Sequence, residues 1–109
     1  MKVLLDECLP LDFRYSFPNH EVHTAQWAGL KGKANGELLR AAELAGYDVL
    51  LTLDQGIPHQ QHVAGFKVGV ITIRSATSQI TDLLPLVKAI LEALLLIQSG
   101  QIISIYCPN

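Results

Sequence analysis

Two short apolar runs that each end in an aspartate decide how this chain folds: residues 3–6, VLLD, and residues 49–54, VLLTLD. Continuous runs of valine and leucine of this length are typical of strands that are buried on both faces, as the strands of a parallel sheet are. Residues 68–73, VGVITI, form a third run of this kind. We therefore predict a parallel sheet, with Asp6 and Asp54 at the carboxyl ends of two of its strands.

Helical patterns and one strand with a solvent-exposed face are predicted between the apolar runs. Pro10 suits the first position of a short helix. Residues 21–25, EVHTA, alternate in polarity, which predicts a strand near an edge of the sheet. Asn35 is expected to cap a helix that carries Glu37 in its first turn and ends at Gly46.

The C-terminal third predicts one long helix over residues 81–99 and a last strand over residues 102–106. Pro85 is tolerated because it lies in the first turn of that helix. Strands that alternate with helices indicate right-handed crossovers and the α/β class. The expected fold is a three-layer α/β/α sandwich with a mostly parallel sheet, formed by residues 1–109 as a single domain.

The composition favours a soluble globular chain. Half of the 109 residues are hydrophobic and 17% are charged, which excludes a disordered chain. The net charge of −2 argues against tight non-specific coating of nucleic acid, which needs many phosphate contacts, but not against a nuclease. No apolar stretch is long enough for a bilayer, and Cys8 and Cys107 are too few for a disulfide framework. We expect a cytoplasmic protein without a membrane segment.

The acidic residues Asp6, Glu37 and Asp54 are expected to share one crevice. In an open parallel sheet, ligands bind beyond the carboxyl ends of the strands, where the winding direction reverses. Clustered carboxylates repel one another unless a cation lies among them, and Mg²⁺ and Mn²⁺ prefer oxygen ligands. The matching reaction is hydrolysis of a phosphodiester by a metal-activated water. Acids at strand ends also serve as helix caps and turn formers, so that interpretation stays open.

Several motifs taken together resemble a known family. They are residues 1–10 (MKVLLDECLP), residues 19–22 (NHEV), the segment from Gly29 through residues 35–39 (NGELL), and residues 52–54 (TLD) with residues 57–61 (IPHQQ). The chain is similar over nearly its whole length to the short PIN-like family of bacterial proteins, within the PIN (PilT N-terminus) superfamily.

This resemblance implies a PIN-like α/β/α sandwich and an endoribonuclease that depends on Mg²⁺ or Mn²⁺. Asp6, Glu37 and Asp54 match the acidic positions of the superfamily's metal and catalytic site. The superfamily includes toxin ribonucleases of toxin–antitoxin modules, so RNA and an antitoxin protein are the implied partners.

The chain departs from the family pattern at three positions. Cys8 stands where many relatives have asparagine, Asn35 where some have aspartate, and Gln55 where a second acid is frequent. A site of three carboxylates binds metal more weakly than a larger acidic set. The alternative function is therefore a catalytically inactive PIN-like module that binds RNA or a protein partner.

Five further residues are expected to bind substrate or support the site: Arg74, Lys31, Lys33, Thr52 and Asn35. Arg74 ends its strand at the same edge and suits a phosphate, although a surface salt bridge explains it equally well. Lys31 and Lys33 are candidate RNA guides or ordinary surface lysines, and Asn35 is first of all a helix cap. Thr52 is expected to line the crevice and orient Asp54.

The remaining polar and aromatic residues carry weaker signals. His59 and His62 have the spacing of a metal pair on a helix but no third ligand nearby. Cys8 is expected to pack rather than react, and Trp27 to anchor its loop rather than stack on a base. Glu7 is expected to point to the sheet face opposite Asp6.

The C-terminal helix has more apolar residues than one sheet-facing stripe can use. Ten large aliphatic side chains lie between Leu83 and Ile97. We expect a homodimer through this helix, with a deeply covered helix as the alternative.

Overall fold

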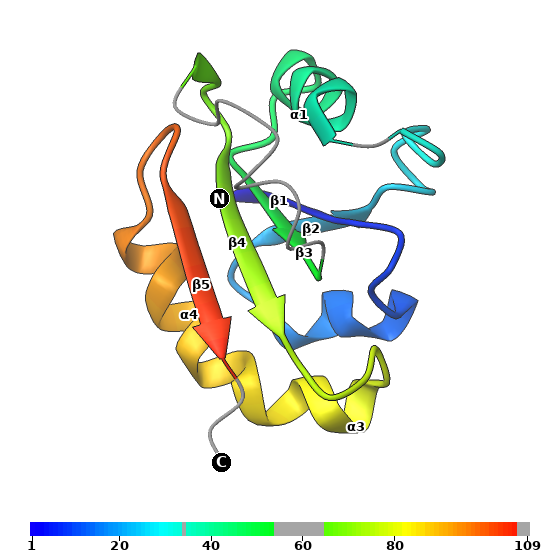
Figure 1. Cartoon of the computed structure of the whole chain (residues 1–109), viewed down its shortest axis with the longest axis vertical. Helices are drawn as coiled ribbons and strands as arrows, with labels where there is room; N and C mark the ends of the chain where they lie inside the picture. The colour runs from blue at the N-terminus through cyan, green and yellow to red at the C-terminus, as the bar shows by residue number, and fades with distance from the viewer. Residues whose placement is uncertain (34, 54–64, 107–109) are drawn as a thin grey trace.

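Five parallel strands form the centre of the computed structural model, which describes residues 1–33, 35–53 and 65–106, without the side chain of residue 35. The strands are β1 (Lys2–Leu5), β2 (Glu21–Thr24), β3 (Val49–Thr52), β4 (Gly69–Arg74) and β5 (Ile102–Tyr106). Their order across the sheet is β2-β1-β3-β4-β5, and every neighbouring pair is parallel (Figure 1). The predicted α/β fold with a parallel sheet is confirmed, and β2 lies at an edge as its alternating pattern indicates.

The helices are shorter than their sequence patterns predict. The first is the 3₁₀ helix η1 (Leu11–Ser16), and the second is α1 (Asn35–Leu44), which begins at the predicted residue. The single helix predicted over residues 81–99 is wrong. The chain instead forms α3 (Ile80–Leu83), a 3₁₀ turn η3 (Leu84–Leu86) and α4 (Val87–Leu96).

Pro85 explains this division of the C-terminal helix. It lies inside η3, and a proline has no backbone N–H to donate to the preceding turn. The helix also ends earlier than expected, because Ile97 has an extended backbone with φ −68° and ψ 140°. Its side chain is almost fully buried, so the chain leaves the helix with an apolar residue turned into the core.

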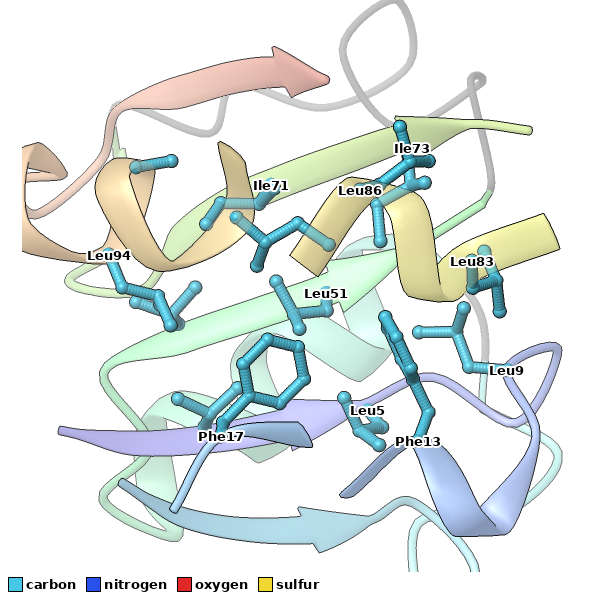
Figure 2. Close-up of a cluster of buried hydrophobic side chains, with 14 of the residues drawn as sticks. Leu5, Leu9, Phe13, Phe17, Leu51, Ile71, Ile73, Leu83, Leu86 and Leu94 are labelled. Carbon is cyan, nitrogen blue, oxygen red and sulfur yellow. The ribbon is translucent and has the colours of Figure 1, made fainter. Parts of the chain in front are cut away.

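Two hydrophobic clusters lie on opposite faces of the sheet, because successive residues of a strand point to opposite faces. On one face, η1, α3 and α4 pack on alternate strand residues such as Leu5, Leu51 and Ile71 (Figure 2). Phe13 and Phe17 of this cluster meet edge to face, with ring centroids 5.1 Å apart. On the other face, α1 packs on the intervening strand residues, which include Leu4, Leu50 and Val70.

Two of the crossovers between parallel strands have opposite hands. The connection from β2 to β3 runs through α1 on one face, whereas that from β4 to β5 runs through α3 and α4 on the other. Both connections move the chain in the same direction across the strand order but over opposite faces of the sheet, so they cannot both be right-handed. The expectation of uniformly right-handed crossovers is therefore wrong for one of them.

Candidate functional site

Asp6 lies at the point where the sheet reverses its winding direction. From β1 the chain moves to β2 on one side, and β3 pairs with β1 on the other. The crevice beyond the carboxyl ends of β1 and β3 is the usual ligand position in such sheets. Asp6 is the first residue after β1, and its backbone N–H donates to the carbonyl of Leu51 at 2.9 Å, which ties it to β3.

Hydrogen bonds hold both oxygens of the Asp6 carboxylate. Oδ2 accepts a hydrogen bond from Thr52 Oγ1 at 2.6 Å, and Oδ1 accepts one from the backbone N–H of Glu7 at 2.7 Å. Asp6 itself is half-buried, whereas Thr52 is fully buried. Thr52 therefore orients Asp6 from within the core, while its predicted contact with Asp54 lies outside the described residues.

Cys8 lies beside this pair. Its Sγ is 3.9 Å from Thr52 Oγ1. Desolvation raises the pKa of the Cys8 thiol above its ordinary value, and the charge of Asp6 acts in the same direction. Hydrogen bonds from the protein oppose this shift but do not overcome it. The thiol is thus protonated near neutral pH and is a poor nucleophile, as expected, although Cys8 is exposed rather than packed in the core.

Glu7 points into a small pocket on the β2 side of the site. The pocket has a volume of about 230 Å³ and is lined by Glu7, Leu9, Leu11, Thr24, Gln26 and Lys31. Glu7 Oε1 accepts a hydrogen bond from the backbone N–H of Gly32 at 3.3 Å, which holds the loop before α1 against the segment after β1. Lys31, one of the two predicted guide lysines, therefore lies in the wall of a pocket beside the site.

Glu37 occupies the first turn of α1, as predicted, and pairs with Lys33. The two charged groups are 3.2 Å apart, and the Glu37 side chain is 70% exposed. Asn35 begins the helix, while its side chain lies outside the described part of the structure. Asp54 lies outside the described residues too, so the convergence of the three acids stays a prediction.

Arg74 lies at the carboxyl end of β4, on the other side of β3 from Asp6. Its guanidinium is 5.6 Å from the ring centroid of Tyr106, and it lines a pocket of about 390 Å³. The pocket walls are Leu53, Ile73, Arg74, Ser75, Thr77 and Ser78. Ser75 Oγ is buried and has no hydrogen-bond partner among the residues that the structure describes. A guanidinium and the serine hydroxyl groups are the kinds of donor that an anion needs, whereas the Thr77 hydroxyl already donates to Asp82.

The described ranges contain no group of three or more His, Cys, Asp or Glu side chains arranged to hold a metal ion. The predicted set cannot be judged on that basis, because Asp54 and the two loop histidines, His59 and His62, lie in the part left undescribed. Within the described residues, no helix has both the length and the apolar character needed to cross a membrane. No protein-family model, curated protein or solved structure matches this chain.

Sequence patterns missed most of the residues that line the pockets. Leu11, Thr24 and Gln26 share the wall with Glu7 and Lys31 although they come from three separate segments. Their types are ordinary for a helix start, a strand and a turn. The one available signal was the alternating polarity of residues 21–25, which predicts a strand with one solvent-exposed face.

Proposed function

We propose that this chain is a divalent-metal-dependent endoribonuclease with a PIN-like α/β/α arrangement. The observation that carries the proposal is the position of Asp6, whose carboxylate is fixed by Thr52 and the Glu7 backbone at the point where the sheet reverses. A carboxylate held at this point is suited to a metal ligand, because its orientation is set before the metal arrives.

Asp6, Glu37 and Asp54 would hold Mg²⁺ or Mn²⁺, which supplies an activated water and offsets charge on the phosphate. The available donors are carboxylate oxygens, which these cations prefer. Each Asp6 carboxylate oxygen accepts one hydrogen bond from the described residues and has a second lone pair for a cation. Glu37 now pairs with Lys33 on the surface, and exposed pairs of this kind contribute only about 0–1 kcal/mol, so its carboxylate can turn toward a metal.

Substrate phosphates would be held by a few contacts on either side of Asp6. The pocket lined by Arg74, Ser75 and Ser78 contains a cation and two serine hydroxyl groups. Lys31 offers a second cation in the pocket beside Glu7. This small number of basic contacts agrees with the net charge of −2 and favours a short bound stretch of RNA.

The test is metal-dependent cleavage of a panel of single-stranded and structured RNAs. We expect cleavage with Mg²⁺ or Mn²⁺, its loss in Asp6→Asn, and its retention in Glu92→Gln, because Glu92 is an exposed acid on α4 and lines none of the pockets described above. Mn²⁺ should also raise the melting temperature, and Asp54→Asn should reduce that rise. Cleavage that persists in Asp6→Asn would contradict the proposal. Binding of RNA without cleavage at millimolar metal would support the inactive module instead.

The partners and setting belong to the same proposal. A homodimer through α4 is supported by Leu95 and Leu96, which are 82% and 73% exposed. Burial of each such leucine contributes about 1.5–3 kcal/mol, and a two-fold contact buries each of them twice. An antitoxin protein, which the family resemblance implies, and a cytoplasmic setting, which the low cysteine content favours, complete the proposal.

A further inference from the structure

Trp27 presents an aromatic ring at the β2 edge of the molecule. Its indole lies against the imidazole of His23, with centroids 4.1 Å apart and an angle of 33° between the planes. The residue is nevertheless 71% exposed. Large aromatic side chains are usually buried, so the expectation that Trp27 serves to anchor its loop does not account for this exposure.

The ring beneath Trp27 is held in place. His23 Nδ1 is 2.9 Å from the hydroxyl of Tyr47, and its Nε2 is 3.6 Å from the Glu21 carboxylate. The backbone N–H of Trp27 donates to Thr24 Oγ1 at 3.1 Å, which fixes the turn that carries the indole. One face of Trp27 is therefore supported by an ordered ring, and a flat ligand can stack on the exposed side without first ordering the site.

A pocket of about 450 Å³ opens beside this ring. Its walls are Leu11, Arg14, Val22, His23, Thr24 and Trp27. Arg14 is held in position, because it donates to the Leu11 carbonyl at 2.8 Å and to the Tyr15 hydroxyl and lies over the Tyr15 ring. A guanidinium has five N–H donors, so donors remain for an anion. The pocket thus combines aromatic and aliphatic walls with one fixed cation, which is the chemistry of a nucleotide site.

This pocket adjoins the one beside Asp6. The pocket of Trp27 and the pocket of Glu7 and Lys31 have Leu11 and Thr24 as common wall residues. A chain of nucleotides with one base on Trp27 would therefore be directed past Lys31 toward the segment that carries Asp6.

We propose that Trp27, supported by His23, stacks on a base of single-stranded RNA, with Arg14 holding an adjacent phosphate. This inference rests on the proposed function for the identity of the ligand. A protein partner would bury the same tryptophan, but it would not require a supported flat ring, a fixed cation and a groove toward an acidic site. Stacking on aromatic side chains is tolerant of sequence, so the site selects single strands rather than a particular base.

The direct probe is the fluorescence of Trp27, which is the only tryptophan of the chain. A short oligoadenylate with 2′-O-methyl groups, which block cleavage, is titrated in EDTA so that neither metal nor catalysis contributes. We expect the emission to be quenched as a base stacks on the indole. Affinity should fall with salt along a shallow slope of about −0.7 per phosphate contact, because one or two cations face the strand.

Variants are compared by the anisotropy of a labelled strand of the same kind. Trp27→Leu should weaken binding about tenfold or more, since stacking on an aromatic ring is lost, whereas Trp27→Phe should retain most of the affinity. Leu44→Ala is the matched control, because Leu44 is also a large, mostly exposed apolar side chain, and it lies on α1. Unchanged emission, or equal binding by Trp27→Leu and the unmodified protein, would overturn the inference and leave a protein partner as the occupant.

The two proposals fail in different ways. Binding in EDTA that depends on Trp27, without cleavage in any metal, would refute the nuclease and leave the stacking site intact. Metal-dependent cleavage that Trp27→Leu leaves unchanged in KM and kcat would refute the stacking site and leave the nuclease intact.

Discussion

The hydrogen bond between Thr52 and Asp6 can be tested by removing each partner in turn. Thr52→Val replaces the hydroxyl with a methyl group of similar size at a fully buried position. Asp6→Ala removes the carboxylate that accepts the 2.6 Å hydrogen bond. The double variant completes a cycle in which the contacts that each residue makes with other groups cancel.

The expected coupling follows from the charge and exposure of the pair. Hydrogen bonds to charged groups contribute about 1.5–3 kcal/mol. Asp6 is half-buried, so water can replace part of the lost bond, which places the coupling at or just below the lower limit of this range, at about 1–1.5 kcal/mol. Asp6→Ala should cost more than this on its own, because it also removes the acceptor of the Glu7 N–H.

The coupling is obtained from the free energies of unfolding in urea of the unmodified protein, the two single variants and the double variant. The same four proteins can be heated with and without Mn²⁺. If Thr52 orients Asp6 for a metal, the Mn²⁺-induced rise in melting temperature should be smaller in Thr52→Val. If the losses in unfolding free energy of Thr52→Val and Asp6→Ala add up to the loss of the double variant within about 0.3 kcal/mol, the hydrogen bond does not hold Asp6 in place. That result would refute the role of Thr52 in the site.

Three further outcomes are expected. Gly69→Ala should lower the free energy of unfolding by about 1–3 kcal/mol, as measured with urea, because a Cβ at this position would lie 2.8 Å from Cδ1 of Ile97. Gly65→Ala is the control and should cost far less, because a Cβ there meets nothing within 4 Å. Cys8 should react with iodoacetamide at pH 8 more slowly than a cysteine in a short peptide, as followed by peptide mass spectrometry, because its raised pKa keeps the thiol protonated. Leu95→Glu should convert a dimer into a monomer in light scattering, whereas Leu44→Glu, at an equally exposed position, should not.

The sequence was sufficient to predict the strands and to place Asp6 directly after the first of them. Each apolar run forms a strand in the structure. A strand that is buried on both faces needs apolar side chains at consecutive positions, and such a run is visible in the sequence. The end of α1 was equally predictable: Gly46, which was expected to close this helix, has a φ of +85°, which glycine adopts easily.

The C-terminal helix shows where local patterns fail. Its apolar spacing continues through residues 81–99, yet the chain forms α3, a 3₁₀ turn and α4. Pro85 and the burial of Ile97 against Gly69 at the start of β4 set these limits. The face on which a helix packs, and hence the hand of its crossover, depends on strands distant in sequence, so no local pattern determines it.

The sequence by itself therefore determined that Asp6 directly follows a buried strand and that the sheet is parallel. Only the tertiary structure decided that Thr52 supports Asp6, that Glu37 pairs with Lys33, and that His23 lies beneath Trp27. Strand formation depends on the burial pattern of adjacent residues, which the sequence displays directly. Contacts within a site depend on the strand order, on register and on side-chain direction, and these are fixed only when the whole sheet has assembled.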